Sequence, residues 1–91
     1  MTVYITAVHM EPSNGSGHEH IASVRWENPG TGASDSSTKA QMVEWINGGG
    51  EARVRDRVGS VQVDVVNASP PYLRTHADGR WTDNLLSLPR Y

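Results

Sequence analysis

Three histidines stand near one another in the N-terminal part of the chain: His9, His18 and His20. Imidazole nitrogens are common zinc and nickel ligands, and histidines on neighbouring strands can share one ion. His9 and His20 would meet at the open end of a hairpin, but two ligands do not complete a tetrahedral site. A third ligand would have to come from Glu11, Glu19 or His76, and the sequence fixes no such geometry. We therefore expect solvated or turn-capping histidines, with no bound metal and no other cofactor.

Arginines alternate along one later segment, at positions Arg53, Arg55 and Arg57. Residues two apart in a strand share a face, so these side chains would form a basic stripe able to contact phosphates. Trp81 or Tyr72 could add the stacking that single-strand binders use. The alternative is a solvated sheet face neutralised by Asp64 and Glu51. Because the net charge is −2, general attraction to nucleic acid is disfavoured, and nucleic-acid binding is the second functional hypothesis.

A hydroxyl, an imidazole and carboxylates occur together at Thr75, His76, Asp78 and Asp83. A catalytic triad is defined by geometry rather than by proximity in sequence, and no nucleophile elbow or oxyanion loop accompanies these residues. The ordinary roles of Asp78 are those of a turn residue. The chain has no cysteine, which excludes disulfides, thiol catalysis and cysteine zinc sites. The sequence therefore predicts a protein that is not an enzyme.

Large apolar side chains are concentrated in the C-terminal part of the chain. Trp81 follows Arg80, and an exposed tryptophan beside arginine is typical of an interface anchor. The candidate contact residues are Trp81, Tyr72, Leu85, Leu86 and Tyr91. Closure of the core is the structural alternative for the same residues, and it is the simplest role for Trp26 and Trp45. The leading hypothesis is a small protein-interaction module whose partner is another protein or a second copy of the chain.

Two pairs of strand-like segments must position these groups. Residues 2–10 and 20–27 alternate in strand fashion around a turn-rich loop, in a register that would place His9 opposite His20 and Ile5 opposite Val24. Residues 53–58 and 61–66 flank Gly59-Ser60, which has the pattern of a type II′ turn. That register places Val54 opposite Val65, Val58 opposite Val61 and Asp56 opposite Val63.

A helix is expected between the two hairpins. Residues 28–37 are small and turn-forming and predict a flexible Ser/Gly-rich loop. Thr38 and Gln41 have the spacing of a capping box, followed by an apolar stripe at helical spacing and a terminating run at 48–50. After two prolines, 72–75 is strand-like and Asp78-Gly79 predicts a tight turn pairing Thr75 with Thr82 and His76 with Trp81.

These elements predict an α+β fold. We expect an antiparallel sheet of about four or five strands with one helix packed on it, in the order ββαββ, followed by a C-terminal hairpin or an extended tail. A length of 91 residues favours a single domain over 1–91. The N-terminal residues lack the pattern of a secretion signal, and no run approaches the ~18 apolar residues of a membrane span, so a cytoplasmic location is expected.

The C-terminal residues also carry a family resemblance. Tyr72-Leu73-Arg74-Thr75, Asp78-Gly79, Asp83-Asn84-Leu85 and Leu88-Pro89 resemble the pattern of a bacterial and bacteriophage family catalogued as "domain of unknown function 3892". The resemblance spans nearly the whole chain and is most specific over 72–89. It implies a small domain of the predicted kind and assigns no activity, cofactor or site residue.

Overall fold

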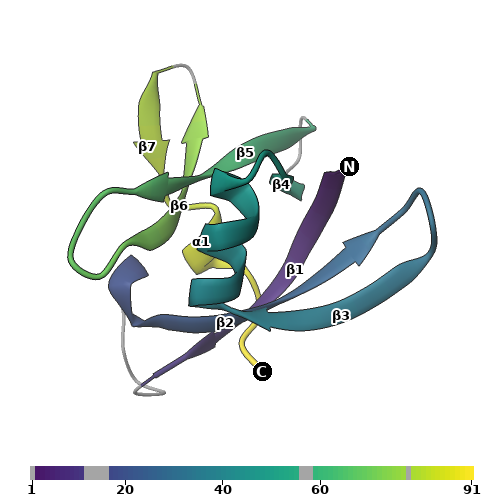
Figure 1. Ribbon diagram of the computed structural model, residues 1–91, viewed down its shortest axis with the longest axis horizontal. Helices are drawn as coiled ribbons and strands as arrows, with labels where there is room; N and C mark the ends of the chain where they lie inside the picture. The colour runs from purple at the N-terminus through teal and green to yellow at the C-terminus, as the bar shows by residue number, and fades with distance from the viewer. Residues whose placement is uncertain (1, 12–16, 56–58, 78) are drawn as a thin grey trace.

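The computed structural model describes residues 2–11, 17–55, 59–77 and 79–91 (Figure 1). These residues form one seven-stranded sheet, one α-helix and two single-turn 3-10 helices. The elements are β1 (Thr2–Met10), η1 (His18–His20), β2 (Ile21–Asn28), β3 (Ala33–Thr38), α1 (Lys39–Asn47), β4 (Glu51–Arg55), β5 (Ser60–Val66), β6 (Tyr72–Ala77), β7 (Arg80–Thr82) and η2 (Leu85–Ser87). The predicted α+β class is confirmed. The sheet is larger than expected because β3 and the C-terminal hairpin join it.

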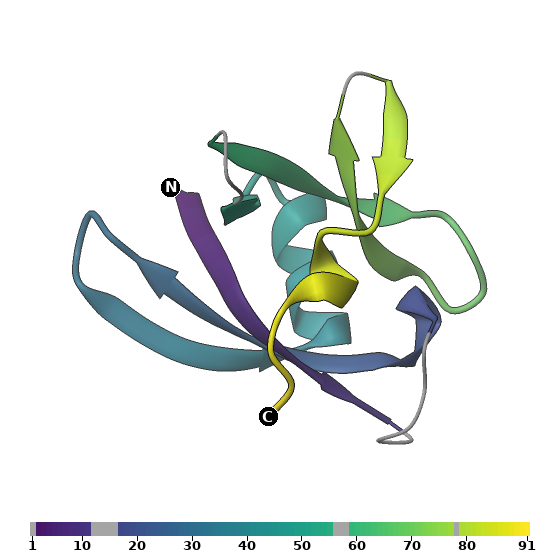
Figure 2. The same cartoon turned by 180° about the vertical axis from the view of Figure 1, so that it is seen from behind.

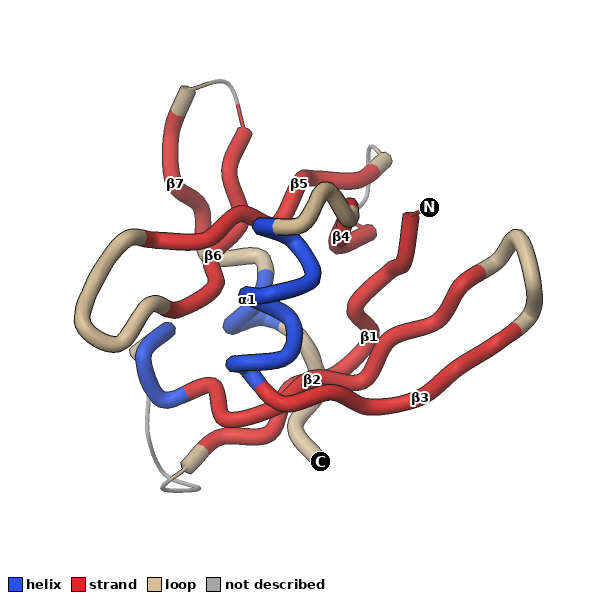
Figure 3. Tube along the Cα trace, in the orientation of Figure 1, coloured by secondary structure: helices blue, strands red, loops and turns tan. Residues whose placement is uncertain are grey.

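The strand order is β3-β2-β1-β4-β5-β6-β7. All neighbours are antiparallel except β1 and β4, which pair in parallel at the middle of the sheet through Thr2–Tyr4 and Glu51–Arg53. The sheet thus consists of two antiparallel sets, β1–β3 and β4–β7, joined along one parallel seam. Figure 3 shows the β2–β3 arm and the β6–β7 hairpin extending from opposite sides of that seam.

The predicted loop over 28–37 is wrong from Ala33 onward, because this part forms β3 and pairs with β2 along its whole length. The turn lies at residues 29–32, where the Asn28 carboxamide oxygen accepts from the Gly30 N–H and Gly32 has a φ of +75°. Most of β3 is exposed at the sheet edge. An edge strand can be held by backbone hydrogen bonds to one neighbour. The side chains of β3 are small and polar, which is not typical of strands, so the sequence did not predict one here.

Both predicted hairpin registers are wrong. In the first, Ile5 pairs with Trp26 and His9 with Ser23, because the register shifts twice along β1 and η1 occupies the residues before β2. In the second, Arg55 pairs with Ser60, so Gly59-Ser60 is not a two-residue turn, and Val54 lies opposite Val61. The expected partners Asp56 and Val58, like Arg57, lie outside the described residues.

The helix begins and ends as the sequence predicts. The Gln41 N–H donates to the Thr38 hydroxyl at 3.2 Å, and the Thr38 N–H donates to the Gln41 side-chain oxygen at 2.9 Å, which completes the capping box. Gly49 follows the helix with a φ of +108°, a left-handed conformation that favours glycine. Met42 and Val43 are buried in a core that also contains Val3, Ile5, Val8, Met10, Ile21, Val24, Ala52, Val54, Val63, Leu73 and Leu85.

The core is covered from two sides. The helix α1 lies nearest the viewer in Figure 1, whereas η2 lies nearest in Figure 2, from behind. After η2 the chain runs beside β1, where the Val8 N–H donates to the Pro89 carbonyl and the Tyr91 N–H donates to the Val8 carbonyl. The tail thus occupies an edge of β1 beyond the part paired with β4. The expected pairing of Thr75 with Thr82 and of His76 with Trp81 is confirmed; Asp78 lies outside the described residues.

Candidate functional site

The five predicted contact residues do not form one surface patch. Leu85 is fully buried, so it has no surface to offer a partner, and Leu86 packs against the core. Tyr72 begins β6, whereas Trp81 pairs with His76 near the other end of that strand. Trp81 is 44% exposed, and its ring lies against His76 with the centroids 5.2 Å apart. Of the predicted residues, Trp81 remains the most exposed apolar one.

Tyr91 is held against the outer side of β1 and β2. Its hydroxyl lies 2.9 Å from the Ser23 hydroxyl, and its ring is 4.8 Å from the guanidinium carbon of Arg25. The Tyr91 carbonyl lies 2.6 Å from Nδ1 of His9. These contacts fix the end of the tail on the sheet.

The histidines do not gather around one point. His9 lies 3.5 Å from Glu11, His20 lies 3.7 Å from Glu19, and His76 lies 3.7 Å from Asp64. Across the part of the chain that the structure describes, no group of three or more histidine, cysteine, aspartate or glutamate side chains is placed to hold a metal ion. Each of these histidines therefore has a separate acidic neighbour.

The two described arginines of the predicted stripe each contact a carboxylate. Arg53 donates to Glu51 at 3.3 Å and to the Ser60 hydroxyl at 2.7 Å. A hydrogen bond from the Thr2 hydroxyl, assisted by Arg53, lowers the pKa of Glu51. Arg55 donates to Glu27 at 2.6 Å and lies 4.1 Å above the ring of Tyr4. Arg57 lies outside the described residues.

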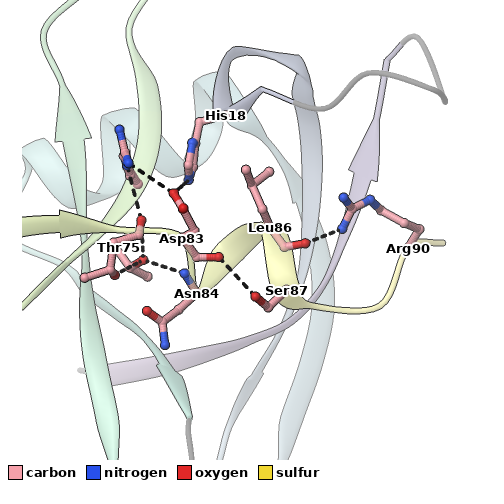
Figure 4. Close-up of polar contacts among 9 residues, drawn as sticks. His18, Thr75, Asp83, Asn84, Leu86, Ser87 and Arg90 are labelled. Atoms are coloured by element: carbon pink, nitrogen blue, oxygen red, sulfur yellow. Dashed lines mark hydrogen bonds and ion pairs between the residues drawn. The ribbon is translucent and has the colours of Figure 1, made fainter.

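A polar cluster joins β6 to the start of η2 (Figure 4). The Thr75 hydroxyl donates to the Thr82 carbonyl at 3.0 Å and accepts from the Thr82 hydroxyl at 2.6 Å and from the Asn84 N–H at 3.1 Å. Arg74 donates to the Thr82 carbonyl and, at 3.0 Å, to Asp83. Thr75 is fully buried, so its hydroxyl has a structural role and is closed to a substrate.

His18 borders this polar cluster and is 7% exposed. Its Nε2 lies 3.7 Å from a carboxylate oxygen of Asp83 and has no hydrogen-bond partner among the described residues. Burial, followed by the charge of Arg74, lowers the pKa of His18, against the opposing effect of Asp83. Folding therefore favours the neutral form of this imidazole. In the sequence, His18 was grouped with His9 and His20. The burial of His18 against β6 could not be predicted, because it depends on a contact between segments that are distant along the chain.

A groove lies between β3 and α1, with a volume of about 420 Å³. This Trp groove is lined by Val3, Trp26, Asp35, Ser36, Ser37, Gln41, Met42 and Trp45. Asp35 pairs across the sheet with Trp26, so both side chains lie on one face. The Trp26 indole N–H donates to the Ser37 hydroxyl at 3.0 Å.

Both groove tryptophans sit at the margin of the core rather than inside it. Each packs against the buried cluster, yet each residue remains partly exposed. Gly50 lies directly against the ring of Trp45, and a β-carbon at that position would collide with the indole. The simple assignment of Trp26 and Trp45 to the core is therefore incomplete. Sequence spacing gave no sign of the groove, because β3 was not recognised as a strand.

A curved mixed sheet, one covering helix and a tail secured by a polar cluster around the buried Thr75 define a small α+β domain. The chain belongs to the family described as "Protein of unknown function (DUF3892)", which matches residues 4–89. Residues that carry the resemblance, including Arg74, Thr75, Asp83 and Asn84, supply the hydrogen bonds of the polar cluster. No curated protein and no solved structure matches this chain. Among the described residues, no helix has the length and apolar character needed to cross a membrane.

Proposed function

We propose that this chain is a small, non-enzymatic protein-interaction module and that its contact surface is the Trp groove. The observation that carries the proposal is the partial exposure of two tryptophans, Trp26 and Trp45, on the walls of one groove. Tryptophan contributes more binding energy than most side chains when a partner covers it. A groove of about 420 Å³ also lies within the range of about 300–1,000 Å³ that ligand sites occupy.

The edge of β3 is a candidate for pairing with an added strand, but two of its N–H groups already have side-chain acceptors. The Ser36 N–H donates to the Asp35 carboxylate at 2.7 Å, and the Thr38 N–H donates to Gln41. An incoming strand would have to displace these side chains. Insertion of partner side chains into the groove is therefore favoured over main-chain pairing along the edge.

The arginine surface supports nucleic-acid binding less well than the groove supports a protein partner. Arg53 and Arg55 are each engaged by a carboxylate, and phosphate would have to compete with Glu51 and Glu27. Such competition lowers the affinity for phosphate, and the negative net charge of the chain lowers it further.

A second copy of the chain is one candidate protein partner.

The three tryptophans provide the test, because each indole N–H gives a separate NMR signal. Linear peptides are selected from a random library on the immobilised protein, and the strongest are titrated into ¹⁵N-labelled protein. We expect shifts of the Trp26 and Trp45 indole signals and none of Trp81. Selection of no peptide above a heat-unfolded control, or shifts centred on Trp81, would overturn the proposal. Sedimentation equilibrium on the wild type and Trp45→Ala reports whether the partner is a second copy.

A further inference from the structure

Most acidic side chains among the described residues have a basic side chain close by, but two do not. Six described carboxylates lie within 4.0 Å of an arginine or histidine side chain: Glu11, Glu19, Glu27, Glu51, Asp64 and Asp83. For Glu11, Glu19 and Asp64 that neighbour is a histidine, which is charged only when protonated. Among the described residues, Asp35 and Glu44 are the two without an arginine or histidine neighbour. Asp35 lines the Trp groove, and Glu44 lines a second hollow that shares Gln41 and Trp45 with it. Both of these carboxylates thus belong to hollows that share the partly exposed side chain of Trp45.

Elsewhere the chain joins one aromatic ring, one carboxylate and one arginine into a complete set. Arg55 lies 4.1 Å above the ring of Tyr4 while donating to Glu27 at 2.6 Å. A guanidinium is stabilised by the negative face of an aromatic ring and by the two oxygens of a carboxylate. The Trp groove contains the ring and the carboxylate of such a set, and its described lining contains no basic residue.

We propose that the Trp groove binds the guanidinium of an arginine from a basic, extended segment of a partner protein. The plane of the guanidinium would lie against the indole of Trp26 or Trp45, with its N–H groups directed to the carboxylate of Asp35. Glu44 would favour a second basic residue near the first. This inference rests on the proposed function, since it names the chemistry of the segment that the groove receives.

The test compares four short probes that differ in one side chain: Ac-Ala-Xaa-Ala-NH₂ with Xaa as arginine, lysine, citrulline or norleucine. Each is titrated at low salt while the Trp26 and Trp45 indole signals are followed by NMR. We expect the arginine probe to bind most tightly and lysine more weakly, with citrulline and norleucine weakest. Added salt should weaken the two cationic probes, because exposed charge interactions are screened.

Two isosteric variants test whether the charges of Asp35 and Glu44 contribute to binding of the arginine probe. Asp35→Asn keeps an oxygen that can accept from the Ser36 N–H, and Glu44→Gln keeps the shape of its side chain. Each should weaken the arginine probe by about threefold, as expected for an exposed ion pair. Glu19→Gln, which changes a carboxylate outside the lining of the groove, is the matched control and should leave binding unchanged.

The outcomes separate this inference from the proposed function. Equal binding of norleucine and arginine, or unchanged arginine binding in both Asp35→Asn and Glu44→Gln, would overturn the cationic specificity while leaving a peptide-binding groove. Library peptides that shift Trp26 and Trp45 but lack arginine and lysine would do the same. Binding of the arginine probe without any library peptide would support guanidinium recognition by the groove and would count against a partner protein as its source, and so against the proposed function.

Discussion

The hydroxyl of Thr75 illustrates how much one buried polar group can do in a small domain. It makes three hydrogen bonds, to the carbonyl and hydroxyl of Thr82 and to the N–H of Asn84. If the hydroxyl were removed, the Thr82 hydroxyl and the Asn84 N–H would lose this acceptor, whereas the Thr82 carbonyl would keep its bond from Arg74. Leaving buried polar groups unpaired costs more free energy than the net value of the bond itself.

Thr75→Val should therefore lower the free energy of unfolding by about 1–3 kcal/mol. The measurement is urea unfolding followed by tryptophan fluorescence. Thr6→Val is the matched control, because Thr6 is an exposed strand residue, and its change should stay within about 0.5 kcal/mol. A Thr75→Val protein as stable as the wild type would contradict the structural role of the hydroxyl.

His18 makes stability depend on pH in a defined direction. Burial and Arg74 lower its pKa in the folded chain below the ordinary value of 6.5, so the unfolded chain binds a proton more readily. This contribution to stability is fully present above the unfolded pKa and is lost as the pH falls through the folded pKa. The unfolding free energy should decrease from about pH 7.5 to about pH 5.5.

The His18→Gln variant should lose less stability over that pH interval than the wild type. Because His20 is a more exposed histidine of the same short helix, His20→Gln serves as the control and should keep the wild-type decrease. Unfolding curves at several pH values measure the difference. Equal pH dependence of wild type and His18→Gln would show that His18 is not responsible.

At the scale of single elements, local patterns were predictable and edge pairing was not. The capping box of α1 involves Thr38 and Gln41 only, so spacing alone was enough to find it. By contrast, β3 depends on the backbone of β2, and its exposed Ser-rich sequence resembles a loop. The register shifts in β1 likewise depend on bulges that alternation of residue types does not encode.

The same capping box supports a prediction for α1. Thr38→Ala removes the side-chain acceptor for the Gln41 N–H and should cost about 1 kcal/mol of stability. Ser34→Ala changes an exposed residue of the same strand without touching the helix and should be nearly neutral. Thermal unfolding by circular dichroism compares the two variants. A larger loss in Ser34→Ala than in Thr38→Ala would contradict this account.

At the scale of the whole molecule, the α+β class was predicted correctly from the sequence. The candidate contact surface was not. Leu85 was assigned to a surface because a leucine-rich end carries no sign of where it docks, and the Trp groove exists only after β3 and α1 come together. Contacts between distant segments were the missing information in both cases.

The docked tail allows a prediction about the edge of β1. Deleting residues 89–91 removes the acceptor of the Val8 N–H and the donor to its carbonyl. The Val8 amide should exchange its hydrogen much faster in the truncated protein, whereas an amide of β5 that pairs with β6 should change less. Hydrogen exchange followed by NMR measures both sites. Unchanged protection at Val8 would show that the tail does not cover this edge.

The parallel seam between β1 and β4 also bears on how fast the chain reaches this structure. Thr2 and Glu51, which meet there, are 49 residues apart, whereas the hairpins on either side connect near neighbours. Hairpins form within about 1–10 μs, but bringing two remote strands together carries a larger entropic penalty. The two antiparallel sets should therefore appear early, and their union at the seam should set the folding rate.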